Sequence, residues 1–205
     1  MHLKLRLAAA AAVFATAVSA HAAVIPSLTS VTPISGVYMF NYQGTLSGDA
    51  GLTTGSKLVI FDFLGYVAGS VFSPYPTVTA STELTSSGLI TIPGQIDDPA
   101  LANLVFTYNG PDFQTSGGPY EPVDFNGIGA RSIYSGLGAD TFAAITVKNN
   151  PDGKPGGTGT LVYDQGFITV PAGAVPEPAT WAMMILGLGG AGAVMRRRRA
   201  RIAFA

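Results

Sequence analysis

Cysteine is absent from the 205 residues, and histidine occurs only at His2 and His21. Without cysteine the chain has no disulfide and no lipid-attachment residue, so an exported form must be stabilised by the packing of its core. Without imidazole or thiol beyond residue 21, Ser-His-Asp and Cys-His nucleophilic sites are excluded, as are the usual zinc and copper ligands. We therefore expect no enzyme, no catalytic residue, no metal site and no cofactor.

Positive charge is also scarce in the middle of the chain. Residues 23–175 contain eleven acidic residues against four basic ones, which gives this stretch a net charge of −7. The whole-chain value of −1 hides the asymmetry, because the other basic residues lie near the two termini. An acidic stretch of this kind is not expected to bind nucleic acid or anionic lipid. Its 153 residues are enough for one domain with a hydrophobic core.

The first 22 residues have the pattern of a secretory signal peptide. Lys4 and Arg6 precede an apolar run at 7–18, and Ala20 and Ala22 supply the small residues at positions −3 and −1 of a cleavage site. We expect cleavage after Ala22, and we exclude residues 1–22 from the fold.

The last thirty residues contain a second apolar run. Pro176 and Pro178 favour an extended segment, and no residue from 179 to 195 is charged. As a helix these 17 residues would span about 25 Å, slightly less than the hydrocarbon core of a bilayer. Trp181 suits a membrane interface, and arginines stop the run on what would be its cytoplasmic side. The arginines are Arg196, Arg197, Arg198, Arg199 and Arg201.

This tail, residues 175–201, resembles the PEP-CTERM sorting signal in its Pro-Glu-Pro-x-x-Trp-Ala-Met-Met variant. The matching residues are Pro176, Glu177, Pro178, Trp181, Ala182, Met183, Met184, Gly187 and Gly189, followed by the arginines. The resemblance implies recognition by exosortase, a membrane-embedded cysteine protease and transpeptidase of Gram-negative bacteria. It also implies export, a transient stay in the inner membrane, and delivery to the cell surface or to the exopolysaccharide matrix. An ordinary C-terminal membrane anchor is the alternative.

Residues 23–174 predict an all-β domain, because helical periodicity is absent there and short β-rich runs alternate with Gly and Pro. We expect a single antiparallel β-sandwich of about eight strands. The expected strands are 36–46, 57–63, 66–72, 77–84, 88–92, 101–108, 131–134, 141–148, 158–163 and 166–170. Segments 61–72, 97–111 and 142–150 together resemble an ectodomain found in a subset of PEP-CTERM proteins, which implies this architecture and no activity.

Few carboxylates in the domain form patterns that suggest chemistry. Asp97 and Asp98 precede Pro99, which predicts a turn rather than an acid–base pair. Glu121 and Asp124 could be the pair of a glycosidase, but a solvated loop is the better interpretation. The segment 149–153 contains Asn and Asp without the ligand spacing of a calcium loop.

Aromatic residues near expected turns leave a second function open. Tyr75, Tyr108, Phe113 and Tyr120 could stack on sugars, although packing in the core or at sheet edges is the commoner role. The sequence thus predicts a non-enzymatic surface or matrix protein sorted by exosortase. The alternatives are a carbohydrate-binding module of the matrix, a plain membrane-anchored periplasmic protein, and a hydrolase that uses acidic residues only.

Overall fold

The computed structural model describes residues 24–85, 97–115, 120–149, 160–173 and 183–189. These residues form nine β-strands and one short helix, at 183–189. The strands are β1 (Val24–Ile34), β2 (Val37–Leu46), β3 (Ala50–Gly51), β4 (Lys57–Phe63), β5 (Val78–Glu83), β6 (Ala102–Tyr108), β7 (Val123–Ser132), β8 (Gly136–Lys148) and β9 (Leu161–Ala172). The prediction of an all-β fold is confirmed.

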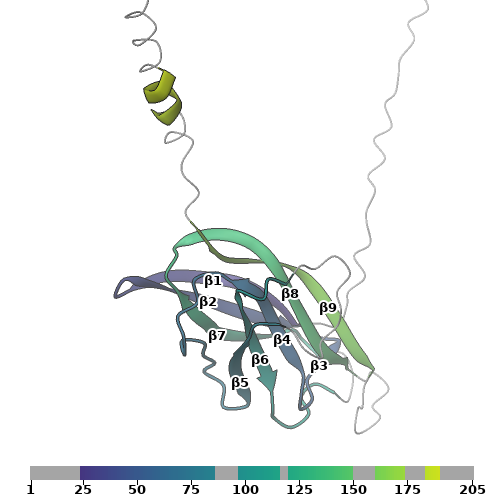
Figure 1. Cartoon of the computed structure of the whole chain (residues 1–205). Coiled ribbons are helices and arrows are strands. Elements are labelled where there is room, and N and C mark those ends of the chain that lie inside the picture. Colours follow the sequence, from purple (N-terminus) through teal and green to yellow (C-terminus); the bar gives the residue numbers. More distant parts are fainter. Residues whose placement is uncertain (1–23, 86–96, 116–119, 150–159, 174–182, 190–205) are drawn as a thin grey trace, which may run out of the picture.

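The strands form two sheets in which every pairing is antiparallel (Figure 1). The smaller sheet has the order β1-β2-β7. The larger has β4 between β8 and β6, with β5 outside β6 and β9 outside β8, and the short β3 also pairs with β8. Antiparallel neighbours need only short connections, which suits a chain rich in Gly and Pro turns.

The hairpin of β1 and β2 shows how local sequence sets this fold. Ile34 pairs with Val37, so Ser35 and Gly36 alone make the turn, and both have positive φ angles, of 50° and 86°. This is the geometry that matches the twist of a two-residue hairpin. Along the second half of β2 every other residue is buried, beginning with Phe40 and Tyr42, which is the pattern of a strand with one face on the core.

A bulge in β4 redirects one of the largest core side chains. Ile60 pairs with Leu104 and Phe63 with Ala102, so two residues of β4 stand opposite Asn103 alone. Asp62 takes up the extra residue with a φ of 49°, and its N–H donates to Asn103 Oδ1 at 2.8 Å. The bulge reverses the alternation, so that Phe61 points out of the main core and Phe63 into it.

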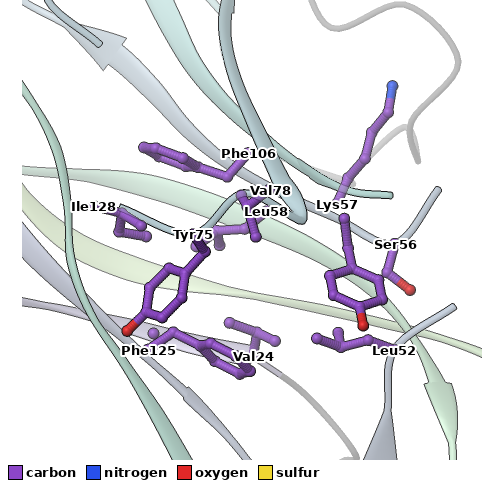
Figure 2. Close-up of a pocket in the computed structure, with 12 residues that line it drawn as sticks. Val24, Leu52, Ser56, Lys57, Leu58, Tyr75, Val78, Phe106, Phe125 and Ile128 are labelled. Carbon is purple, nitrogen blue, oxygen red and sulfur yellow. The ribbon is translucent and has the colours of Figure 1, made fainter. Parts of the chain in front are cut away.

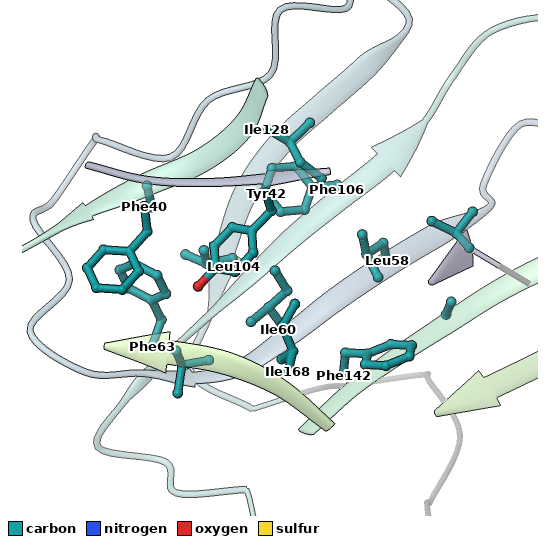
Figure 3. Packing of buried hydrophobic residues seen from close by; sticks show 14 of the residues in the cluster. Phe40, Tyr42, Leu58, Ile60, Phe63, Leu104, Phe106, Ile128, Phe142 and Ile168 are labelled. Atoms are coloured by element: carbon teal, nitrogen blue, oxygen red, sulfur yellow. The ribbon is translucent and has the colours of Figure 1, made fainter. Parts of the chain in front are cut away.

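Between the two sheets lie a small apolar pocket near one end of the strands (Figure 2) and a closely packed core (Figure 3). At the other end Phe40 of β2 meets Phe63 of β4 edge to face, with ring centroids 5.6 Å apart, and Phe63 meets Tyr66 at 6.4 Å. Aromatic pairs of this geometry stabilise a core beyond their buried area. Both sheets contribute to one core, as the two layers of a sandwich do.

Several strand predictions are wrong in detail. Residues 66–72 form a loop held to β7 by single bridges at Tyr66 and Phe72, and not a strand. The expected strand 131–134 is the end of the much longer β7, which begins at Val123 inside the expected loop. The two expected strands 158–163 and 166–170 are the single strand β9, and β1 was not expected at all. The expected strand 88–92 lies outside the described residues.

The tail contributes the helix at 183–189 to the described part of the chain. These seven residues fall inside the helix expected at 179–195, whose other residues lie outside the described ranges. Within the residues that the structure describes, none of the helices has the length and apolar character needed to cross a membrane.

Candidate functional site

Four residues of the predicted sorting signal lie on the 183–189 helix: Met183, Met184, Gly187 and Gly189. Met183 is 70% exposed, and the other apolar side chains of this helix are more than half exposed. A helix that is apolar on every face is suited to a membrane or to a binding groove, and not to one side of a soluble domain.

The remaining predicted site residues lie outside the residues that the structure describes. They are Ala20, Ala22, Pro176, Glu177, Pro178, Trp181, Ala182, Arg196, Arg197, Arg198, Arg199 and Arg201.

The β-domain has an apolar pocket of about 60 Å³ lined by residues of both sheets (Figure 2). Residues of both sheets and of the loops beside them line it, among them Val24, Leu58, Phe106 and Phe125. Lys57 borders the pocket, but its side chain extends away from the other lining residues (Figure 2). A pocket so small, with so little polar surface, can hold a small apolar group and is not suited to a sugar.

Two of the tyrosines considered for sugar stacking line this pocket. Tyr75 is half-buried, packs edge to face on Phe125 at 5.6 Å, and its hydroxyl oxygen accepts the Asn126 N–H at 2.8 Å. Tyr108 is also half-buried and donates its hydroxyl to the Pro111 carbonyl oxygen at 2.7 Å. A stacking platform needs rings that stand free on the surface. These two rings are half-buried and pack against the core, so the requirement is not met at Tyr75 and Tyr108.

A buried carboxylate at the β4 bulge was not among the sequence-based candidates. Asp62 is 8% exposed and accepts the Asp98 N–H through Oδ1 at 3.0 Å. Burial raises the pKa of Asp62 to about 6. The hydrogen bond from the Asp98 N–H lowers this pKa, and the negative charges of Asp140, Asp97 and Asp98 raise it further. The sequence signal that could have found it is one carboxylate inside the apolar run KLVIFDF.

The acidic residues around Asp62 serve to hold a turn. Asn103 Nδ2 donates to Asp97 Oδ1 at 2.9 Å, and the Ala100 N–H donates to Asp98 Oδ1 at 2.9 Å. The second bond is the side-chain turn expected of Asp before Pro, so the turn prediction for Asp97 and Asp98 is confirmed. Among the residues that the structure describes, no group of three or more His, Cys, Asp or Glu side chains could hold a metal ion.

The comparisons with known proteins identify the tail. The family model of the PEP-CTERM protein-sorting motif matches residues 174–199, which include the Pro-Glu-Pro segment, the apolar run and four of the five arginines. The chain carries a PEP-CTERM sorting motif. The prediction of a PEP-CTERM sorting signal in the tail is thereby confirmed, and the motif implies export and sorting by exosortase. No curated protein and no solved structure matches the chain.

The other candidates considered from the sequence are Glu121, Asp124 and the segment 149–153. Asp124 lies on β7 and accepts the Thr45 hydroxyl at 2.7 Å, which ties β7 to β2. Glu121 lies in the exposed stretch before β7. Asn149 is buried at the end of β8, where its N–H donates to the Asp49 carbonyl oxygen at 2.7 Å. The rest of the segment 149–153 lies outside the described residues.

Proposed function

We propose that this chain is an exosortase substrate: a non-enzymatic protein that is exported, sorted through its tail, and placed at the cell surface or in the exopolysaccharide matrix. The observation that carries the proposal is the PEP-CTERM motif at residues 174–199. The passive role assigned to the β-domain is supported by its composition, since residues 23–175 contain neither cysteine nor histidine.

Each part of the tail has a separate role in this proposal. Pro176, Glu177 and Pro178 present an extended strip to the protease, because two prolines fix the backbone and prevent helix formation between them. Residues 181–189 dock in the bilayer, which is consistent with the exposed apolar helix at 183–189. The arginines hold the orientation of the tail and delay its release. In this reaction the tail is the substrate.

The test follows the location of the protein in its host, with and without exosortase. The full chain should move from the inner membrane to the envelope surface or the medium only when exosortase is present. Replacing Pro176 and Pro178 by Ala should block this transfer, because the strip can then continue the helix. The matched control is Glu177→Gln, which removes a charge and keeps the extended backbone.

Two outcomes would decide against the proposal. If the protein stays in the inner membrane in both strains, the tail is a plain anchor. If it reaches the surface equally well without exosortase, another route delivers it. A loss of transfer in Glu177→Gln as strong as in the proline variant would show that the charge, and not the extended backbone, is recognised.

A further inference from the structure

Strand β9 is the outer strand of the larger sheet, and within the described residues it pairs with β8 alone (Figure 1). Between its start and Phe167 it exposes Leu161 by 54%, Tyr163 by 50% and Phe167 by 82%. Side chains alternate along a strand, and Ile168 and Val170 are in the core, so these three lie on the face turned away from it. A long edge strand with exposed apolar side chains is a template for another strand.

Two hydrogen bonds fix which backbone groups of β9 face the open edge. The Lys148 N–H of β8 donates to the Thr160 carbonyl oxygen, just before β9, at 3.0 Å. The even-numbered residues of β9 therefore direct their N–H and C=O groups toward β8. The Tyr42 hydroxyl, from the smaller sheet, donates to the Thr169 carbonyl oxygen at 3.0 Å. Since the β8–β9 register has no shift, all odd-numbered residues turn their N–H and C=O groups to the open edge. Before Thr169 these are Leu161, Tyr163, Gln165 and Phe167.

This edge is complementary to a second copy of itself in antiparallel orientation. When Gln165 stands opposite Gln165 of the second copy, Tyr163 stands opposite Phe167 and Phe167 opposite Tyr163. Aromatic cross-strand pairs are among the most stabilising in a sheet. In the same register Asp164 faces Gly166, so the like charges do not meet. A shift by two residues would place Asp164 opposite Asp164 and lose both aromatic pairs.

The other outer strands are less suited to pairing. β1 contains Pro26 and Pro33, which lack an N–H to donate. The free side of β7 is bridged by Tyr66 and Phe72. β5 has six residues and ends in Glu83, against twelve residues in β9. Of the outer strands, β9 is therefore the best suited to pair with another strand.

We propose that β9 is a self-association edge, through which two copies of this chain join their larger sheets in the Gln165-centred register. Asp164 keeps this association weak. The Gln165 N–H, which would donate to the second copy, donates instead to Asp164 Oδ1 at 2.9 Å in the single chain. The carboxylate must swing away before two edges can pair. The pairing therefore depends on a high local concentration, such as accumulation at one surface would provide.

The absence of cysteine allows a direct test with single cysteine variants. Gln165→Cys, expressed in the full chain and recovered from the host, should form a disulfide-linked dimer under mild oxidation. In the proposed register the two Cα atoms at 165 lie about 5.5 Å apart, within the range of a disulfide. Tyr163→Cys and Phe167→Cys are the matched controls. Each would lie about 13 Å along the strand from its equivalent, which is too far to cross-link.

Sedimentation of the recovered protein over a wide concentration range tests the energetics without cross-linking. Phe167→Lys should weaken dimer formation by about tenfold, because both aromatic pairs are lost. Asp164→Ala should strengthen it, because the capping carboxylate is removed. Equal cross-linking at 163, 165 and 167 would overturn the register. A protein that sediments as a monomer at every concentration, with Asp164→Ala also monomeric, would overturn the proposal.

Discussion

Phe40 and Met183 illustrate how differently the two parts of this chain use apolar residues. Phe40 is completely buried between the sheets, where it packs on Phe63, whereas Met183 is 70% exposed on the tail helix. The apolar residues of the β-domain are used to build a core. Those of the tail helix are exposed, and in the proposed function they contact a membrane and a protease. We infer that stability and sorting are encoded in separate stretches of the chain. A substitution in one stretch should therefore change one property and leave the other unchanged.

Replacing Arg196–Arg199 by Ala should have the largest effect on sorting and none on the β-domain. Arg201 alone then remains to hold the apolar run in its orientation, so most of the surface product should be lost. Lys replacements keep the charge and are the control; they should be sorted normally. Fractionation of the host measures the product, and thermal unfolding measures the domain. A clear change in the melting temperature would mean that the two stretches are not separate.

Phe40→Ala should have the largest effect on stability. Removing a fully buried ring leaves a cavity beside Phe63, and such changes cost about 3–5 kcal/mol. The control is Ile25→Ala, since Ile25 is 50% exposed and should matter little. Denaturant unfolding of the recovered protein gives both values. The folded fraction of the Phe40 variant should still be cut in its tail; failure to do so would show that the core takes part in sorting.

Asp62→Asn should stabilise the β-domain at neutral pH. The pKa of Asp62 is raised to about 6 by burial, so between about pH 4 and pH 6 the folded state holds a proton that the unfolded state has released. Stability contributed by this proton is therefore lost as the pH rises through that window. The Asn variant avoids the loss, and we expect a gain of about 1 kcal/mol at pH 7, because it replaces a carboxylate whose charged form is penalised by burial.

Thermal unfolding between pH 4 and pH 7 measures the effect of Asp62→Asn. The wild-type melting temperature should fall across this window relative to that of the variant. Asp98→Asn is the control, because Asp98 is exposed and its turn can form with an amide. Parallel curves for wild type and Asp62→Asn would show that Asp62 titrates normally.

Phe167→Thr should have the smallest effect, with a change in the free energy of unfolding of about 0.5 kcal/mol or less. Phe167 is 82% exposed, so a single chain gains little from its burial, and Thr suits a strand. Urea unfolding at low protein concentration measures it. A large loss of stability would mean that Phe167 packs within the chain and is not kept for a partner.

The sequence predicted best those strands whose side chains alternate or run apolar without interruption. β4 has the expected bounds, 57–63, and the starts of β2 and β6 differ from the expected ones by one residue. β1 was not predicted; it contains Pro26 and Pro33, which an inner strand would exclude but an outer strand tolerates. β9 was divided at Gly166, where the Phe142 ring fills the space that a side chain would need.

For function, the local sequence was sufficient for the tail but not for the β-domain. The tail was identified from its motif alone, because a sorting signal is read as a local sequence. The pocket depends on residues that tertiary packing brings together from several strands, and no local pattern marks it. The sequence marks Asp62 only as the one carboxylate in the apolar run 57–63; its burial and its neighbours depend on tertiary packing. Tyr75 and Tyr108 were considered as exposed sugar contacts for the same reason. Their place against the core follows from β5, β6 and β7 coming together.

The intact mass of the protein recovered from the host, with and without exosortase, tests the account most directly. We predict a product that begins at Ala23 and lacks Arg196–Arg201 when exosortase is present, and a product that keeps these arginines when it is absent. The mass also locates the cut relative to Pro176. A protein that retains Arg196–Arg201 in both strains would contradict the account, because the tail would then be an anchor.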